Sequence, residues 1–188
     1  MCRGIVSMLR IFCVGQFSTG VLAADRELQP SINACDFLTV TELTAIVSAK
    51  VERGVRDDSG AVDSGDYAVA GTYSSTCLWR FSRGRSRTAD SNLSFGQESY
   101  VILNVMQWPS GSGQATRFLD SFRDAAKRGE IPQAPVPVKI ADEALWWGDG
   151  VALYKEDKSA GVSVHLVGGR ERERGMEEAL ARMVASRL

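Results

Sequence analysis

The chain has 188 residues and a net charge of −1, and 44% of its residues are hydrophobic and 24% are charged. These values are ordinary for a globular protein whose length suits one domain with a sizeable core. The charge balance provides neither a basic footprint for nucleic acid nor a polybasic patch for a membrane surface.

Residues 1–24 have the pattern of a secretory signal peptide. Arg3 and Arg10 provide a positive start, residues 11–17 form a short apolar run, and small residues lead to cleavage after Ala24. The apolar run is too short to span a bilayer, and the alternative is a buried first helix. Cleavage removes two arginines and no acids, so the net charge changes from −1 to −3. We therefore predict a periplasmic or secreted protein, with residues 25–188 as one domain.

Two of the four cysteines, Cys2 and Cys13, would leave with the signal peptide. An exported chain with two remaining cysteines usually joins them, so we predict a disulfide between Cys35 and Cys77. The bond would close a loop of 42 residues. Loop closure of this length stabilises a fold by about 4 kcal/mol. The alternative is two buried free thiols.

The first predicted helix covers residues 40–49. Thr39 and Glu42 have the spacing of a capping box, in which each side chain accepts a hydrogen bond from the backbone N–H of the other residue. Leu38 and Leu43 stand at the two positions of a hydrophobic staple, which fixes how the chain enters the helix. The helix therefore has a well-marked beginning, just after Cys35.

Residues 50–75 have a weaker pattern, with short strands predicted near residues 51–56 and 67–73 and aspartate-rich turns between them. The aspartates lack the alternating spacing, the central glycine and the closing glutamate of an EF-type calcium loop. We predict a solvated loop and expect neither a metal nor another cofactor.

The next segments are easier to assign. Residues 76–81 alternate in the manner of a strand, and residues 82–98, rich in arginine and serine, are predicted to form an exposed loop. Residues 100–108 have the strongest strand pattern, which Pro109 ends. A second helix follows Gly113 and ends at Gly129. The glycines before this helix could bind an anion, although the pattern is weak.

The last part of the chain is predicted as strands near residues 144–147, 151–155 and 161–167, followed by a helix over residues 171–187. A three-residue, glycine-containing loop would pair Trp147 with Val151. A turn centred on Asp157 and Lys158 would pair Leu153 with Val162. One face, assigned to the helices, then contains Leu145, Trp147, Val151, Leu153, Val162 and Val164.

The opposite face of these strands would contain Trp146, Tyr154, Ser163 and His165. Aromatic side chains grouped away from the helices are typical of a contact surface, because such side chains bury large areas at interfaces. We predict this candidate contact face as the nearest feature to a functional site. The alternative is that residues 50–75 or 82–98 fold over it, or that it is exposed without a function.

Catalytic motifs are missing from the sequence. His165 is the one histidine, and no Ser-His-Asp arrangement, Gly-x-Ser-x-Gly elbow, His-Glu-x-x-His motif or metal-binding cysteine pair accompanies it. Asp142 and Glu143 are adjacent carboxylates, but neighbours on a strand point to opposite faces. We therefore do not expect an enzyme.

Several short motifs resemble a family of small bacterial envelope proteins of unknown function, many of which are lipoproteins. The opening Cys35-Asp36-Phe37-Leu38-Thr39 with Glu42 is similar to the family's Cys-Asp-Leu-Leu-Thr-x-x-Glu motif. Cys77-Leu78-Trp79 looks like its second cysteine, and the segments 135–137 and 141–146 look like its Pro-Val and Asp-x-Ala-x-Trp motifs. The resemblance implies an exported α+β domain with one disulfide and implies no catalytic residues.

We expect an α+β fold with an antiparallel sheet of about five to seven strands and three helices packed mainly on one face. The main functional hypothesis is an exported, non-enzymatic binding protein. Its ligand would be a protein, such as a toxin that it neutralises, or an envelope component. The alternatives are a hydrolase that acts on the envelope and a purely structural envelope protein.

Overall fold

The structure is a computed structural model that describes residues 32–61, 71–82, 98–167 and 171–188. The predicted signal peptide and most of the predicted loop at residues 82–98 lie outside the described residues. The strand predicted near residues 67–73 also lies mostly outside them.

The described residues form an α+β fold, as predicted. The helices are the 3-10 helix η1 (Ala34–Asp36), α1 (Val40–Val47), α2 (Gln114–Lys127) and α3 (Glu171–Ala185). The strands are β1 (Lys50–Val51), β2 (Val55–Ala61), β3 (Tyr73–Ser82), β4 (Ser99–Gln107), β5 (Val136–Val138), β6 (Glu143–Trp146), β7 (Val151–Lys155) and β8 (Lys158–His165). The eight strands are slightly more than the five to seven that we expected.

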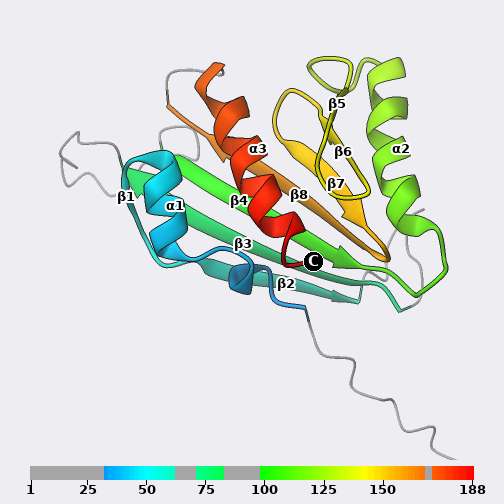
Figure 1. Cartoon of the computed structure of the whole chain (residues 1–188), viewed down its shortest axis with the longest axis horizontal. Coiled ribbons are helices and arrows are strands. Elements are labelled where there is room, and N and C mark those ends of the chain that lie inside the picture. Colours follow the sequence, from blue (N-terminus) through cyan, green and yellow to red (C-terminus); the bar gives the residue numbers. More distant parts are fainter. Residues whose placement is uncertain (1–31, 62–70, 83–97, 168–170) are drawn as a thin grey trace, which may run out of the picture.

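All strands belong to one antiparallel sheet, shown in Figure 1. The order is β1-β3-β4-β8-β7-β6-β5, and β2 also pairs with β3, beyond the part that pairs with β1. The three longest strands, β3, β4 and β8, are neighbours in this order. β4 pairs on one side with β3, which precedes it in the chain, and on the other side with β8 near the C-terminus.

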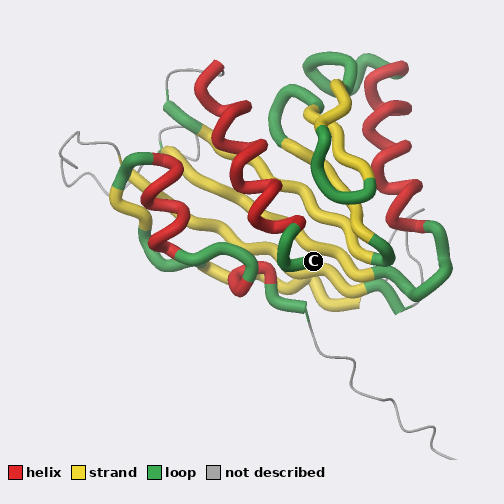
Figure 2. The backbone as a smooth tube through the Cα atoms, in the orientation of Figure 1, coloured by secondary structure: helices red, strands yellow, loops and turns green. Residues whose placement is uncertain are grey.

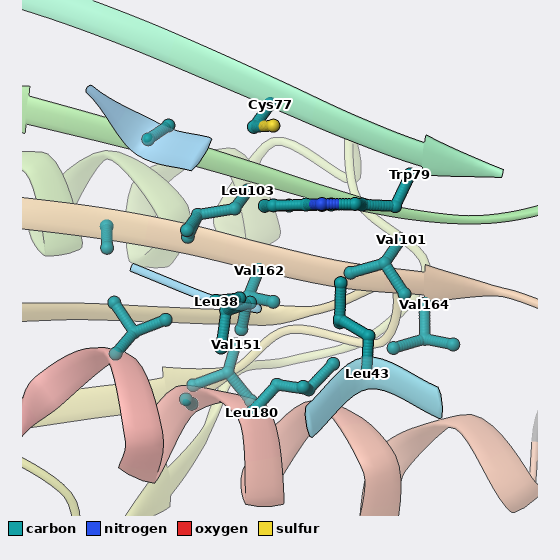
Figure 3. Close-up of a cluster of buried hydrophobic side chains, with 14 of the residues drawn as sticks. Leu38, Leu43, Cys77, Trp79, Val101, Leu103, Val151, Val162, Val164 and Leu180 are labelled. Carbon is teal, nitrogen blue, oxygen red and sulfur yellow. The ribbon is translucent and has the colours of Figure 1, made fainter. Parts of the chain in front are cut away.

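Helices α1 and α3 cover one face of the sheet, as the tube drawing in Figure 2 also shows. Alternate residues of the central strands point toward these helices and form the main core. Figure 3 shows Leu43 of α1 and Leu180 of α3 packed toward Leu103 and Val162 of the sheet. All four side chains are fully buried.

Helix α2 covers the opposite face of the sheet at the β6–β7 end. Leu119 of α2 packs with Leu145 of β6 and Ala152 of β7 in a second, smaller core. In Figure 1 the strands β5, β6 and β7 therefore lie between α3 and α2. Two of the three helices share a face, as predicted, and the third does not.

The start of α1 confirms the predicted capping box. The Thr39 side chain accepts from the backbone N–H of Glu42 at 3.2 Å, and the Thr39 N–H donates to Glu42 Oε2 at 2.9 Å. Leu38 and Leu43, the predicted staple residues, are both buried in the main core. The helix ends at Val47, two residues earlier than predicted, because Ser48 adopts a left-handed backbone with φ 51°.

The predicted disulfide between Cys35 and Cys77 is present, with 5.1 Å between the Cα atoms. It joins η1 to the centre of β3. A hydrogen bond from the Ala34 N–H to Ser75 Oγ at 3.0 Å lies beside it and is buried. The segment that precedes α1 is therefore attached to the sheet by a covalent bond and a buried hydrogen bond.

The C-terminal end of α3 is held by the β7–β8 hairpin. The Lys155 ammonium donates to the carbonyl of Ala185 at 3.2 Å, and the Lys158 ammonium donates to the carbonyl of Leu188 at 2.9 Å. Cationic donors suit this position because the last carbonyls of a helix lack partners within the helix.

Candidate functional site

The β6–β7 hairpin closes one residue more tightly than we predicted. Trp146 pairs with Val151, and the Trp147 N–H donates to the Gly150 carbonyl at 3.1 Å. The loop therefore contains two residues, Gly148 and Asp149, instead of three. Gly148 has φ +104° and Gly150 has φ +156°, values that favour glycine and permit the tighter turn. A slip of one residue moves every side chain of β6 to the other face of the sheet.

The prediction that Trp146 belongs to the contact face is therefore wrong. Trp146 lies on the α3 side of the sheet and packs against the main core. Leu145 and Trp147, which we assigned to the main helix face, lie with α2 instead. The rings of Trp147 and Phe122 of α2 are 5.5 Å apart.

The register of the β7–β8 hairpin also differs from the prediction, but the face on which each side chain lies does not. Lys155 pairs with Lys158 and Val151 pairs with Val162, a shift of two residues from the predicted register. Because side chains alternate with a period of two, such a shift leaves each side chain on its predicted face. Tyr154, Ser163 and His165 therefore share one face, as predicted. Tyr154 packs against the smaller core beneath α2, whereas Ser163 and His165 lie outside that core.

The part of this face that β2, β3, β4 and β8 form is the candidate functional site. Helix α2 packs at the β6–β7 end, and no other described helix lies on this side of the sheet. Cross-strand neighbours form two adjacent rows here. We call the residues of the two rows the open face: Val55, Leu78, Ile102 and Ser163 in the first row, and Arg80, Tyr100 and His165 in the second.

The first row of the open face is apolar apart from Ser163, and the second is polar and aromatic. Val55 is 56% exposed at the edge of the sheet, and Leu78 and Ile102 continue the apolar row inward as half-buried side chains. In the second row the rings of Tyr100 and His165 stack at 4.9 Å. Arg80 Nε lies 3.1 Å from Glu98 Oε2, and both side chains are partly exposed. The result is a surface with an apolar row and, beside it, a row of polar and aromatic groups.

A buried carboxylate on the opposite side of the sheet was missed by the sequence analysis. Glu177 of α3 is 1% exposed and accepts hydrogen bonds from Trp146 Nε1 at 2.8 Å and from the Val164 N–H at 3.0 Å. The guanidinium of Arg174 lies 4.6 Å from the centre of the Trp146 ring. These contacts bind α3 to the sheet.

A sequence signal for Glu177 existed in the helix periodicity. Glu177 precedes the buried residues Leu180, Ala181 and Val184 at spacings of three, four and seven, so it belongs to the apolar stripe of α3. A glutamate at such a position requires hydrogen-bond partners in the core, because burying an unpaired charge is costly. In the structure one of these partners is Trp146, which lies beneath the helix.

A hollow of about 540 Å³ lies beside the start of α2, where the sequence suggested a weak anion site. Gly113 caps the helix with φ 68° and provides no side-chain hydrogen bond. Glu156 and Asp157 also line the hollow. Two carboxylates repel an anion, so the geometry does not support anion binding here.

Several acidic residues in the described part of the chain have lowered pKa values, and each of them forms an ion pair at the surface. The Arg128 guanidinium holds the pKa of Glu130 below its usual value, and the Lys127 ammonium does the same for Asp124. Within the described ranges, no three histidine, cysteine, aspartate or glutamate side chains are grouped as a metal ion would require. In the same part of the chain no helix has the length and apolar character needed to cross a membrane.

No protein-family model matches this chain, and neither a curated protein nor a solved structure matches it. The resemblance to the envelope family, based on short motifs, stays a prediction. Function is therefore inferred from the surfaces of the chain itself.

Proposed function

We propose that this chain is an exported, non-enzymatic binding protein that contacts a protein partner through the open face. The observation that supports this function is the apolar row of Val55, Leu78 and Ile102 on a side of the sheet where no described helix covers it. A row that begins at a strongly exposed valine offers apolar area that a partner can remove from water.

The composition of the open face favours a protein as the partner. Protein interfaces combine apolar side chains with a polar rim. Tyrosine and arginine are enriched at such interfaces, and Tyr100 and Arg80 stand beside the apolar row. His165, stacked on Tyr100, extends the same rim.

Two features support the export of this protein. Residues 1–24 have the pattern of a signal peptide. The Cys35–Cys77 disulfide is of the kind that persists in oxidising compartments and is rare in reducing ones. Expression with the native leader, followed by N-terminal sequencing of the periplasmic or secreted product, tests the proposal. We expect the product to begin at Asp25, and an intact Met1 on cytoplasmic protein would contradict export.

Binding can be tested with variants that alter the open face without touching the core. Val55→Asp places a charge in the apolar row, and Tyr100→Ala removes the neighbouring ring. Val136→Asp is the matched control, because Val136 is 39% exposed at the opposite edge of the sheet. Each processed protein is used as bait in an extract of its own compartment. The Kd of the captured protein is then measured with purified components.

We expect Val55→Asp and Tyr100→Ala to weaken binding at least tenfold, in line with the loss of about 1.4 kcal/mol or more at a central contact. Val136→Asp should leave the Kd unchanged. Equal affinities for all three variants would place the interface elsewhere. If wild-type bait retains no protein beyond that retained by Val55→Asp bait, the proposed function is wrong.

A further inference from the structure

A second hollow, of about 540 Å³, opens beside the Cys35–Cys77 disulfide. Its volume is in the range of ligand-binding pockets. It lies between the start of α1 and the segment that joins β1 to β2. The residues that matter for its chemistry are Cys35, Leu38, Val40, Arg53, Gly54 and Trp79.

The indole N–H of Trp79 is a hydrogen-bond donor that lines this hollow. Trp79 is 2% exposed, and its Nε1 has no hydrogen-bond acceptor among the described residues. Gly54 lies directly against it, because a Cβ atom at position 54 would be 2.5 Å from Nε1. Both residues line the hollow. The N–H is open to solvent at the hollow, so a ligand oxygen there would replace water as its acceptor.

A free cation stands at the rim of the same hollow. Arg53 is exposed and makes no hydrogen bond or ion pair with any described residue. Arg56 lies nearby and donates to the Ile32 carbonyl at 3.5 Å. Asp36 is the acidic residue that lines the hollow, so cationic groups outnumber anionic ones. The charge and the donor together favour an anion.

The other wall of the hollow is apolar. Leu38 is buried, Val40 is 39% exposed, and the disulfide lies beside them. An exposed valine at the start of a helix is apolar surface that a ligand chain can cover.

We propose that this hollow binds a small carboxylate with an apolar chain. The carboxylate accepts the Trp79 N–H and pairs with Arg53, and the chain lies along Val40 and Leu38. A fatty acid and the C-terminus of a short apolar peptide share this chemistry. The site is separate from the open face, because Trp79 and Leu78 are neighbours on β3 and point to opposite sides of the sheet.

NMR of the processed, 15N-labelled protein tests the site directly. Octanoate and acetyl-dileucine are titrated, and octanamide and acetyl-dileucine amide serve as neutral controls of matched shape. The assigned Trp79 indole resonance reports on the donor itself. Arg53→Gln removes the cation, and Arg117→Gln is the matched control, because Arg117 is an exposed arginine of α2, outside the hollow.

We expect at least one acid to shift the Trp79 indole proton downfield and to bind at least about tenfold more tightly than its amide, because a charged acceptor forms the stronger hydrogen bond and the neutral amide cannot pair with Arg53. Arg53→Gln should weaken binding by a similar factor, and Arg117→Gln should not. Binding of octanoate alone would indicate a fatty acid, and binding of the peptide acid alone would indicate a peptide terminus. An unmoved Trp79 resonance at millimolar ligand, or amides that bind as well as acids, would overturn the proposal.

Discussion

Replacing Glu177 by glutamine tests how firmly the buried carboxylate holds α3 on the sheet. In the wild-type protein its two oxygens accept from Trp146 Nε1 at 2.8 Å and from the Val164 N–H at 3.0 Å. Val164 lies beyond the end of the β7–β8 pairing, which stops at Val151 and Val162. The carboxylate therefore takes the place of a strand partner for the last part of β8.

The cost of Glu177→Gln follows from the number of acceptors. Glutamine has the same length but one oxygen, so in either orientation of the amide one of the two donors faces an N–H group. A buried donor left unsatisfied costs about 1–3 kcal/mol. We expect a loss of about 2 kcal/mol, which lowers the Tm by about 4–8 °C for a domain of this size.

Urea unfolding followed by circular dichroism, with the disulfide intact, measures this loss. Glu178→Gln is the matched control, because Glu178 accepts at the helix surface from Arg174 and Arg182 and should cost under about 0.5 kcal/mol. In a Trp146→Phe background the indole donor is absent, so Glu177→Gln should cost about 1 kcal/mol less. A wild-type stability for Glu177→Gln, or no coupling with Trp146→Phe, would refute this account of α3.

Three further predictions concern stability. The Arg187 guanidinium, followed by the N-cap N–H, lowers the pKa of Glu42 from 4.5 to about 2. The stabilisation is therefore complete above pH 4.5 and lost as the pH falls toward 2. In thermal unfolding Glu42→Gln should cost about 1 kcal/mol at pH 7, since both side chains are partly exposed, and only a small part of that at pH 2, where the carboxyl is about half protonated. Cys35→Ser and Cys77→Ser should each cost about 4 kcal/mol in urea, and the denatured processed protein should titrate no thiol without reductant. Gly175→Ala, in an exposed and open part of α3, should add about 0.5–1 kcal/mol, and a lower Tm would contradict this.

Local features of the fold could be read from the sequence. The capping box of α1 depends on residues 39–42 alone, and both of its hydrogen bonds form as predicted. The strand predicted at residues 100–108 is β4 at Ser99–Gln107, because its alternation and Pro109 mark it without reference to the rest of the chain. The disulfide was predictable because the predicted signal peptide leaves two cysteines to pair.

Strand register could not be read in the same way. The segment Gly148-Asp149-Gly150 permits a loop of two or of three residues, and local sequence does not distinguish them. The difference is decided by distant contacts, since Trp146 donates to Glu177 and Gly150 lies against Ser163 of β8. Ser163 and His165 were placed on the correct face because their register error was two residues.

The open face could be predicted in part from the sequence, whereas the hollow beside the disulfide could not. The open face follows partly from alternation in β4 and β8, but the place of α2 on the same side was not predicted. The hollow beside the disulfide was missed, because Arg53 and Gly54 lie in a segment with little pattern. A donor without an acceptor, such as the Trp79 N–H, has no signature in a single sequence.

The pairing of β4 with β8 has a consequence for how the chain folds. β4 can form its hairpin with β3 early, but its other edge stays open until β8 has been synthesised, and α3, which covers the apolar face, comes later still. Contacts between residues so far apart in sequence slow folding, because loop closure must precede them. A nascent chain that lacks β8 and α3 would therefore expose Val101, Leu103 and Val105, and this part of the fold would form only after both elements have been synthesised.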